Sequence, residues 1–290
     1  MQTTTKAQFS HDLRWGDFTA MATKGPYLAW LTNAFDLAEL NVGGKTVASV
    51  LNTLANAQST ELNVEFVDQA RLDNDPRYYE QIIAEEGVIP TREDSWHDFF
   101  NGLIWLQFPQ TKHALNLWHM QDIVDYGVNP RTPRRNRITH FDECGLVLVS
   151  NSRQAEDILA ALREHNWEYA LYEQREAWGT HIVPLVFGHA NLEMLLAPFP
   201  GLTAKWCQVT LETPLLQVIS GAQTATVDSA LLETLQSEDV LSKPRQLMPL
   251  PLLGIPGWAS AQDEVFYQNR EVFRPRRQER DQGSGEPVRK

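Results

Sequence analysis

The sequence predicts an α+β fold, because segments with apolar residues at helical spacing are interspersed with short alternating or β-branched segments. A chain of 290 residues with 42% hydrophobic and 21% charged residues has the balance of an ordinary globular domain. We therefore predict one α+β domain over residues 25–277, built from a buried central helix pair and a small mixed sheet that includes one β-hairpin. A proline-rich strap over residues 248–277 is expected to pack on this domain, because its apolar and aromatic residues need cover while its prolines prevent long helices.

The two ends of the chain differ in composition from this domain. Residues 1–24 are polar and mixed, which predicts a flexible N-terminal segment. Residues 278–290 combine basic residues with glycine and few apolar side chains, which predicts a disordered basic tail.

The first predicted elements precede the helix pair. Residues 43–58 are expected to form a helix entered from a glycine turn, residues 62–68 a short strand, and residues 77–87 a helix closed by Gly87. The sequence GGKT at 43–46 lacks the first glycine of a phosphate-binding loop, so that motif is rejected.

The centre of the chain predicts the helix pair. Ser95, followed three residues later by Asp98, has the spacing of a capping box, and the apolar residues from Phe99 to Phe108 surround the helix on all sides. Pro109 either kinks this helix or opens a second one over residues 110–124.

Polar side chains interrupt both of these apolar helices. His97, Asp98 and Asn101 lie near the amino end of the first helix. Lys112, Asn116 and His119 lie at i, i+4 and i+7 of the second, on one face. Lys112 is in a first helical turn, where the helix dipole disfavours a cation, so we expect an anion nearby.

These two groups of polar residues have two interpretations. Asp98 is either a cap or part of a site, and the stripe is either a solvated face or one wall of a pocket. His113 and His119 point in different directions on a helix, so the two-histidine zinc motif is rejected.

The second half of the chain is predicted from the same patterns. Residues 137–150 are expected to form a hairpin around a turn of Asp142, Glu143, Cys144 and Gly145, with Gly145 at a positive φ. The remaining predicted elements are helices at 152–165, 189–197, 213–222 and 227–236, and strands at 181–188 and 204–212. Pro184 in the first of these strands predicts a sheet edge or a bulge.

Several classes of protein are excluded or disfavoured. Cys144 and Cys207 alone form neither a disulfide framework nor a cysteine zinc site, and the sequence has no serine-hydrolase elbow and no dinucleotide-binding fingerprint. The net charge of −12 argues against a broad nucleic-acid surface. No apolar run is long enough to span a membrane and the N-terminus lacks the features of a secretion signal, so we expect a cytoplasmic protein.

Further candidate residues lie in the second half. Asp142 and Glu143 can ligate a hard cation, although a turn also uses Asp for its own geometry. Arg135, in the arginine-rich stretch 131–137, can bind a phosphate or carboxylate in a bidentate manner. His189 follows a predicted strand at the start of a helix, where open sheets tend to bind ligands.

Four separated sequence stretches carry a resemblance to a known family: residues 87–116, 139–150, 186–201, and the pair 250–258 and 266–277. In this order they resemble a bacterial family catalogued as domain of unknown function 3025, over roughly residues 25–277. The resemblance implies one continuous domain in a cytoplasmic bacterial protein, and it implies no activity. The family pattern has an Arg-Asp pair and an Asn where this chain has Arg135 with Asn136, and Cys144. The positions that match the polar motifs of the family are Arg92, His97, Asp98, Asn101, Lys112, Asn116, Asp142, Glu143 and His189.

Two functions lead the possibilities that the sequence leaves open, and nucleic-acid binding, limited to the arginine-rich stretch and the basic tail, ranks third. The first is a small-molecule enzyme or ligand-binding protein that performs metal-assisted hydrolysis of a phosphate- or carboxylate-containing substrate. In it, His97 or Asp98 is a general base or metal ligand, Asp142 and Glu143 hold a divalent metal, and Lys112 with Arg135 clamps the anion, with Arg92, Asn101, Asn116, His119 and His189 as further ligand-binding residues. The second is a non-catalytic interaction module, in which the strap and basic tail bind a protein partner. It requires an exposed aromatic groove near the strap and no titratable cluster in a pocket.

Overall fold

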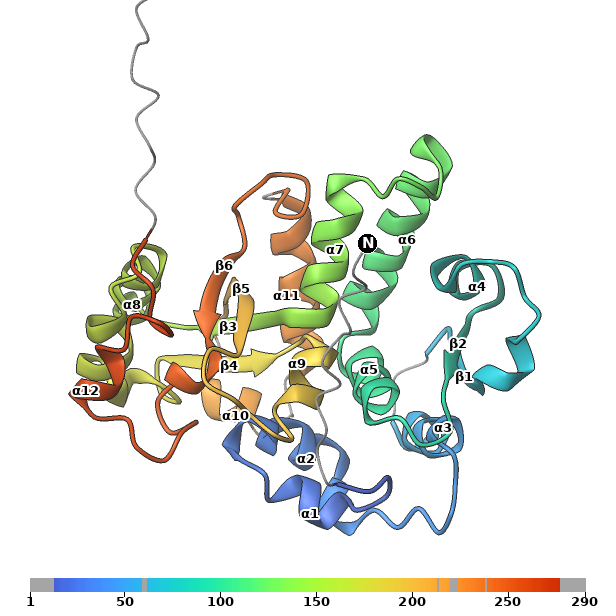
Figure 1. Ribbon diagram of the computed structural model, residues 1–290, viewed down its shortest axis with the longest axis horizontal. Helices are drawn as coiled ribbons and strands as arrows, with labels where there is room; N and C mark the ends of the chain where they lie inside the picture. The colour runs from blue at the N-terminus through green and yellow to red at the C-terminus, as the bar shows by residue number, and fades with distance from the viewer. Residues whose placement is uncertain (1–12, 59–61, 213, 220–223, 238, 277–290) are drawn as a thin grey trace, which may run out of the picture.

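The computed structural model describes residues 13–58, 62–212, 214–219, 224–237 and 239–276. These residues form a single mixed α/β domain, in which long central helices lie between a four-stranded sheet and a small two-stranded sheet (Figure 1). The strands are β1 Glu65–Asp68, β2 Val88–Thr91, β3 Gly145–Ser150, β4 Ile182–Val186, β5 Thr203–Thr210 and β6 Met248–Pro251. The α-helices are α1 Phe18–Ala22, α2 Ala29–Phe35, α3 Val47–Ala57, α4 Tyr79–Glu86, α5 Trp96–Gln107, α6 Pro109–Tyr126, α7 Pro133–Cys144, α8 Arg153–Arg163, α9 His189–Met194, α10 Leu215–Ile219, α11 Thr224–Ser237 and α12 Glu264–Tyr267.

The larger sheet is mixed, with the strand order β4-β3-β5-β6. Strand β3 runs parallel to β5 and antiparallel to β4, and all six of its residues are buried. Strand β4 is at one edge, which is where Pro184 can be accommodated without loss of a ladder hydrogen bond. In the smaller sheet, β1 and β2 pair in parallel, and α3 and α4 contact it.

The central helix α5 is buried along almost its whole length. The Ser95 side chain accepts a hydrogen bond from the Asp98 amide and so caps the helix, as its spacing predicts. Every residue from Phe99 to Gln107 is buried. Pro109 is the first residue of α6, where its missing amide hydrogen costs no helical hydrogen bond.

Helix α11 holds the amino end of α6. Asp228 is fully buried, and its two carboxylate oxygens each lie 2.9 Å from a backbone nitrogen, one of Gln110 and one of Thr111. These amides have no partner within α6, so the carboxylate satisfies them and also places a negative charge at the positive end of the helix. This interaction positions the first turn of α6, which contains Lys112.

The predicted β-hairpin at residues 137–150 is wrong. Residues 133–144 form helix α7, and only β3 follows as a strand. Thr132 caps α7 by accepting from the Arg135 amide, Pro133 takes the first helical position, and Ile138 and Phe141 lie on one buried face. Gly145 has a φ of −74° and begins β3, so it does not occupy the positive-φ turn position that we predicted.

The chain ends also differ from the predictions. In the N-terminal segment, residues 13–24 are described, and Phe18 and Met21 of α1 are fully buried in the core, so this part of the segment is packed. Near the C-terminus, β6 adds a strand to the sheet, and Tyr267 and Phe273 are buried. The predicted basic tail at 278–290 lies outside the described residues. Among the residues that are described, no helix is both long and apolar enough to cross a membrane.

The Asp228 contact gives a stability prediction. We expect Asp228→Ala to lower the free energy of unfolding by about 2 to 4 kcal/mol, because two backbone amides lose their buried acceptor. Chemical denaturation measures this change. Ser229→Ala is the matched control: Ser229 accepts an exposed hydrogen bond from the Gln110 side chain, so its loss should cost less than about 1 kcal/mol. Equal effects of the two substitutions would contradict the prediction.

Candidate functional site

Strand pairing brings together two chain junctions that are distant in sequence. Leu146 of β3 pairs with Val186 of β4, so the start of β3 lies beside the end of β4. The backbone nitrogens of Phe187 and Gly188 both donate to the carbonyl oxygen of Gly145, at 3.0 and 2.8 Å. The carboxyl end of α7 is therefore held against the amino end of α9.

Gly188 makes this close approach possible. A Cβ atom at this position would lie 2.4 Å from the Gly145 nitrogen and 2.5 Å from the Glu143 carbonyl oxygen. Both distances are too short for a contact between a Cβ atom and the backbone. The next residue along the chain is His189, the first residue of α9. Glu143 and His189 are thus neighbours because residue 188 has no side chain.

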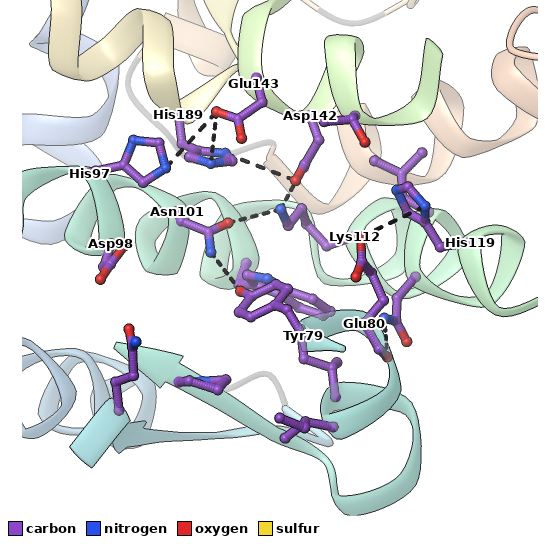
Figure 2. A pocket seen from close by; sticks show the side chains of 18 of the residues that line it. Tyr79, Glu80, His97, Asp98, Asn101, Lys112, His119, Asp142, Glu143 and His189 are labelled. Atoms are coloured by element: carbon purple, nitrogen blue, oxygen red, sulfur yellow. Dashed lines mark hydrogen bonds and ion pairs between the residues drawn. The ribbon is translucent and has the colours of Figure 1, made fainter. Parts of the chain in front are cut away.

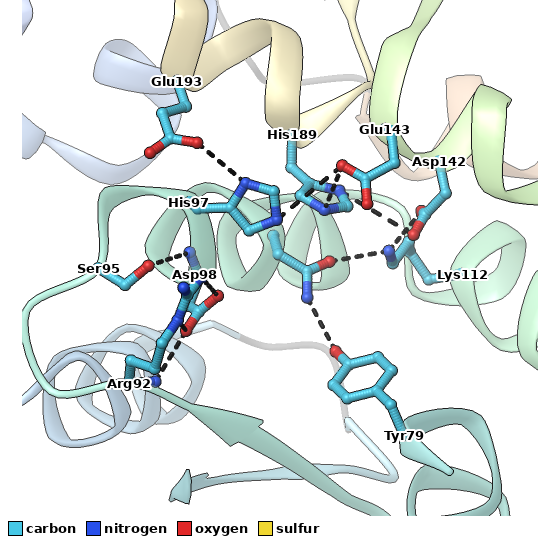
Figure 3. A network of polar contacts seen from close by, with 11 residues as sticks. Tyr79, Arg92, Ser95, His97, Asp98, Lys112, Asp142, Glu143, His189 and Glu193 are labelled. Carbon is cyan, nitrogen blue, oxygen red and sulfur yellow. Dashed lines mark hydrogen bonds and ion pairs between the residues drawn. The ribbon is translucent and has the colours of Figure 1, made fainter. Parts of the chain in front are cut away.

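The side chains of His97, Glu143 and His189 converge on one point (Figures 2 and 3). Glu143 Oε2 lies 3.3 Å from His189 Nε2 and 3.9 Å from His97 Nε2. The two imidazole rings meet edge to face, with centroids 4.6 Å apart. One potential ligand atom from each residue lies within 4.8 Å of the other two, which is a grouping that can hold a metal ion.

The other ring nitrogen of each histidine faces a second carboxylate (Figure 3). His97 Nδ1 lies 3.0 Å from Glu193 Oε2, and His189 Nδ1 lies 4.0 Å from Asp142 Oδ2. The hydrogen bond between His97 Nδ1 and Glu193 favours the tautomer whose lone pair is on Nε2, and metal-binding histidines are commonly oriented in this way. His189 Nδ1 has no hydrogen-bond partner among the described residues, so the Asp142 carboxylate acts on this ring through its charge. Both Nε2 atoms are directed at Glu143.

The surroundings shift the pKa values of the two histidines in opposite directions. Burial lowers the pKa of His97, but the hydrogen bond with Glu193 and the charge of Glu143 outweigh it, so the pKa lies above its ordinary value. Burial lowers the pKa of His189 to about 3, against the opposing effect of Asp142. His189 is thus neutral near pH 7 and its lone pair is available to a ligand.

A chain of buried hydrogen bonds leads from this cluster into the cavity. The ammonium group of Lys112, whose side chain is 4% exposed, donates to Asp142 Oδ1 at 2.5 Å and to Asn101 Oδ1 at 2.9 Å. The Asn101 amide nitrogen in turn donates to the Tyr79 hydroxyl oxygen at 2.9 Å. Burial raises the pKa of Asp142, but Lys112 and His189 lower it by more, so the pKa is below its ordinary value. Asp142 is the anion that the position of Lys112 requires.

Arg92 and Asp98 form a separate pair at the edge of the site. The Arg92 guanidinium makes two hydrogen bonds of 2.8 Å to the Asp98 carboxylate, and the Arg92 amide makes a third. Burial raises the pKa of Asp98, yet these bonds lower it by more, and the pKa is below its ordinary value. An acid held in this way is a weak base, so the arrangement disfavours Asp98 as a proton acceptor.

Most of the residues predicted for the site line one cavity of about 700 Å³. The lining includes Arg92, His97, Asp98, Asn101, Lys112, Asn116, His119, Asp142, Glu143 and His189. The stripe on α6 is buried, so the solvated-face interpretation is wrong. Arg135 is the exception: it is fully buried, is absent from the cavity lining, and donates from one guanidinium nitrogen to the Val128 carbonyl oxygen. Its Nε and Nη2 atoms have no hydrogen-bond partner among the described residues, so its role as an anion clamp stays a prediction.

Three acceptors or donors of the site were missed in the sequence. Glu193 lies four residues after His189 on α9, and this spacing was a usable signal for a shared helix face. Glu80 and Tyr79 belong to α4, and their partners on α5 and α6 are far away in sequence. No local pattern could have connected them.

The buried Lys112–Asp142 pair predicts a strong thermodynamic coupling. We expect Lys112→Met to cost about 2 to 4 kcal/mol of unfolding free energy, since it leaves a largely buried carboxylate unpaired. The double variant with Asp142→Asn should cost less than the sum of the single variants, by about 1 to 3 kcal/mol. Arg276→Met, which breaks an exposed pair with Glu164, is the control and should change stability by less than about 1 kcal/mol. Additive single effects at 112 and 142 would contradict the coupling.

The Gly188 contact predicts a separation of the cluster. Gly188→Ala should destabilise the protein by about 1 to 3 kcal/mol through overpacking, and it should weaken divalent-cation binding because it moves His189 away from Glu143. Gly254→Ala provides a matched clash, with a Cβ 2.6 Å from Phe273, outside the cavity lining. It should lower stability without affecting cation binding. Thermal unfolding and calorimetric titration with Zn²⁺ measure the two effects, and unchanged Zn²⁺ affinity in Gly188→Ala would refute the prediction.

Comparison with known proteins supports the resemblance read from the sequence. A family model described as "Protein of unknown function (DUF3025)" matches residues 64–277, which is more than half of the chain and contains every residue of the cluster. No curated protein and no solved structure matches the chain. The chain therefore belongs to the DUF3025 family.

Proposed function

We propose that the protein is a metal-dependent hydrolase whose divalent cation is bound by His97, Glu143 and His189. The observation that carries this proposal is the convergence of two Nε2 atoms on one Glu143 oxygen, at 3.3 and 3.9 Å, while both Nδ1 atoms face other carboxylates. A pair of histidines and one carboxylate is a known ligand set of catalytic zinc sites.

The spacing of these atoms supports a tetrahedral ion. Two ligands at about 2.1 Å from a tetrahedral metal lie roughly 3.4 Å apart, which is close to the distances between Glu143 and the two histidines. Three protein ligands leave a fourth position open for water or substrate. The cluster lines the cavity, so this position is accessible to a small molecule.

The charges in the cavity also favour a bound cation. The cationic side chains in its lining are Arg77, Arg92, Lys112 and Arg131, and each lies within 3.8 Å of a carboxylate. The acidic residues in the lining are Asp73, Asp75, Glu80, Asp98, Asp142 and Glu143, two more than these cations. A divalent ion would balance this excess, and it would supply the positive charge that attracts a phosphate or carboxyl-derived group of a substrate.

The residues of the chain then have distinct roles. The bound metal would lower the pKa of a water molecule and polarise the substrate oxygen. Glu193 orients His97 through its hydrogen bond, Asp142 faces Nδ1 of His189, and Lys112 keeps Asp142 charged. The Tyr79 hydroxyl accepts from Asn101 and keeps its own proton for donation, so it can stabilise negative charge on a substrate oxygen. Asp98 positions Arg92 and does not act as the base.

The structure gives less support to the interaction-module hypothesis. That hypothesis requires an exposed aromatic groove and no titratable cluster in a pocket. In the part of the C-terminal segment that is described, Tyr267 and Phe273 are buried, and the titratable cluster is present. A protein partner for the residues beyond 276 stays a separate prediction.

The decisive experiment is the metal content of the full chain, purified without chelators and measured by mass spectrometry. We expect close to one zinc or manganese ion per chain, and at least tenfold lower occupancy after His97→Ala, His189→Ala or Glu143→Gln. His113→Ala is the control, because His113 is exposed on α6 outside the cavity lining.

Two results would overturn the proposal. One is wild-type protein without metal whose Zn²⁺ affinity does not change in the triad variants. The other is stoichiometric iron with loss of ions in the same variants, because two histidines and one carboxylate also form the iron site of oxygenases, and the reaction class would then be different.

A further inference from the structure

The cavity has a second polar region, formed by Asn116 and His119 of α6 and Glu80 of α4, which we call the distal pocket. The side chains of Asn116 and His119 are more than nine-tenths buried. In the part of the chain that the structure describes, Asn116 Oδ1 and His119 Nδ1 have no hydrogen-bond partner. A buried polar atom without a partner is costly, and a ligand that supplies the missing bond removes this cost.

The orientation of the Asn116 amide is fixed by its other end. Asn116 Nδ2 donates to the Glu80 carbonyl oxygen at 2.9 Å. Flipping the amide would place two oxygens against each other, so the carbonyl end is the one left without a partner. A carbonyl oxygen accepts hydrogen bonds and cannot donate them. The missing partner of Asn116 is therefore an N–H or O–H group.

The immediate surroundings of Asn116 Oδ1 disfavour an anion, although charges of both signs act on the neighbouring His119. The Glu80 carboxylate lies 3.9 Å from His119 Nδ1 (Figure 2). It also lies 3.8 Å from the Arg131 guanidinium. Arg131 also donates to the Thr139 hydroxyl, so its charge is shared between an acid and a neutral acceptor. Burial lowers the pKa of His119 to about 4, so this side chain is neutral near pH 7. An anion placed against Asn116 Oδ1 would face a carbonyl oxygen that can only accept hydrogen bonds. The positive charges of Arg131 and Arg135 act on His119, and both lower its pKa.

We propose that the distal pocket recognises an uncharged hydrogen-bond donor of the substrate, such as a hydroxyl or amide group, and that the reacting group at the other end binds the metal. This inference rests on the metal centre proposed above and adds the substrate class. The substrate is then bifunctional, with an anionic or carbonyl group at the metal and a neutral donor at Asn116 and His119.

The helix sets the separation of the two groups. Lys112 contacts Asp142 beside the metal ligands, and His119 follows seven residues later on the same face of α6. A rise of about 1.5 Å per residue places the distal pocket roughly 10 Å along the helix from Lys112. The substrate therefore has an extended spacer between its two groups, of a length that a cavity of about 700 Å³ can contain.

A matched series of hydroxamic acids tests this inference on the full-length Zn²⁺-loaded protein. The hydroxamate group binds the metal, and tails of three to eight methylene groups end in a methyl, a hydroxyl, a primary amide or a carboxylate. At the best tail length, the hydroxyl and amide compounds should bind about five- to tenfold more tightly than the methyl compound, as expected for one buried hydrogen bond. The carboxylate compound should bind more weakly than the hydroxyl compound.

Variants in the distal pocket assign the effect to its residues. Asn116→Leu and His119→Phe should abolish the advantage of the hydroxyl and amide tails while leaving affinity for the methyl compound within about twofold, which also shows that the variants are folded. Leu117→Ala is the control, because Leu117 is exposed on the same helix and should change neither affinity.

The outcomes separate the two proposals. If no hydroxamate binds in a zinc-dependent manner, the metal centre itself is wrong. If all tails bind equally at every length, or if the carboxylate tail binds most tightly, the metal centre stands and the assignment of the distal pocket is overturned.

Discussion

The site depends on the contact between the α7–β3 junction and the β4–α9 junction. Antiparallel pairing of β3 with β4 places the start of β3 beside the end of β4, so the two junctions are neighbours. The absence of a side chain at Gly188 lets their backbones touch. Glu143 and His189 come from these two junctions. Helix α5 supplies His97, because α5 packs directly against α9. Each member of the cluster is therefore placed by backbone packing rather than by a flexible loop.

The polar groups of the site are supported by a second set of charges. Asp142 lies between Lys112 and His189, so it compensates the buried ammonium group and places a negative charge beside the imidazole. Asp228 holds the first turn of α6, from which Lys112 projects. The stability of the helix pair and the geometry of the cluster thus depend on the same two carboxylates. Buried charges of this kind are retained where each has a partner, because an unpaired one would destabilise the fold.

Local patterns were sufficient for much of the fold. The cap at Ser95 and the buried length of α5 follow from residue types at short spacing. For Pro109 the sequence left a kink or a helix start open, and for Pro184 a sheet edge or a bulge, and the structure has the helix start and the edge. The hairpin at 137–150 was predicted because Asp, Glu and Gly are typical of turns. The prediction was wrong, since Thr132 and Pro133 begin a helix that continues to Cys144. Two local signals competed, and packing of Ile138 and Phe141 into the core decided for the helix.

The sequence by itself determined that α5 is buried, that Ser95 caps it, and that polar side chains interrupt an apolar centre. It could not determine which of these polar residues meet. His97 and Glu143 are 46 residues apart in the sequence, and so are Glu143 and His189. Only the register of β3 against β4 brings Glu143 and His189 together. The sequence predicted both Arg135 and Glu143 as site residues. In the structure, Arg135 is fully buried and Glu143 lines the cavity. Tertiary structure decided this, because helical periodicity fixes the relative directions of side chains and packing alone fixes which direction is the interior.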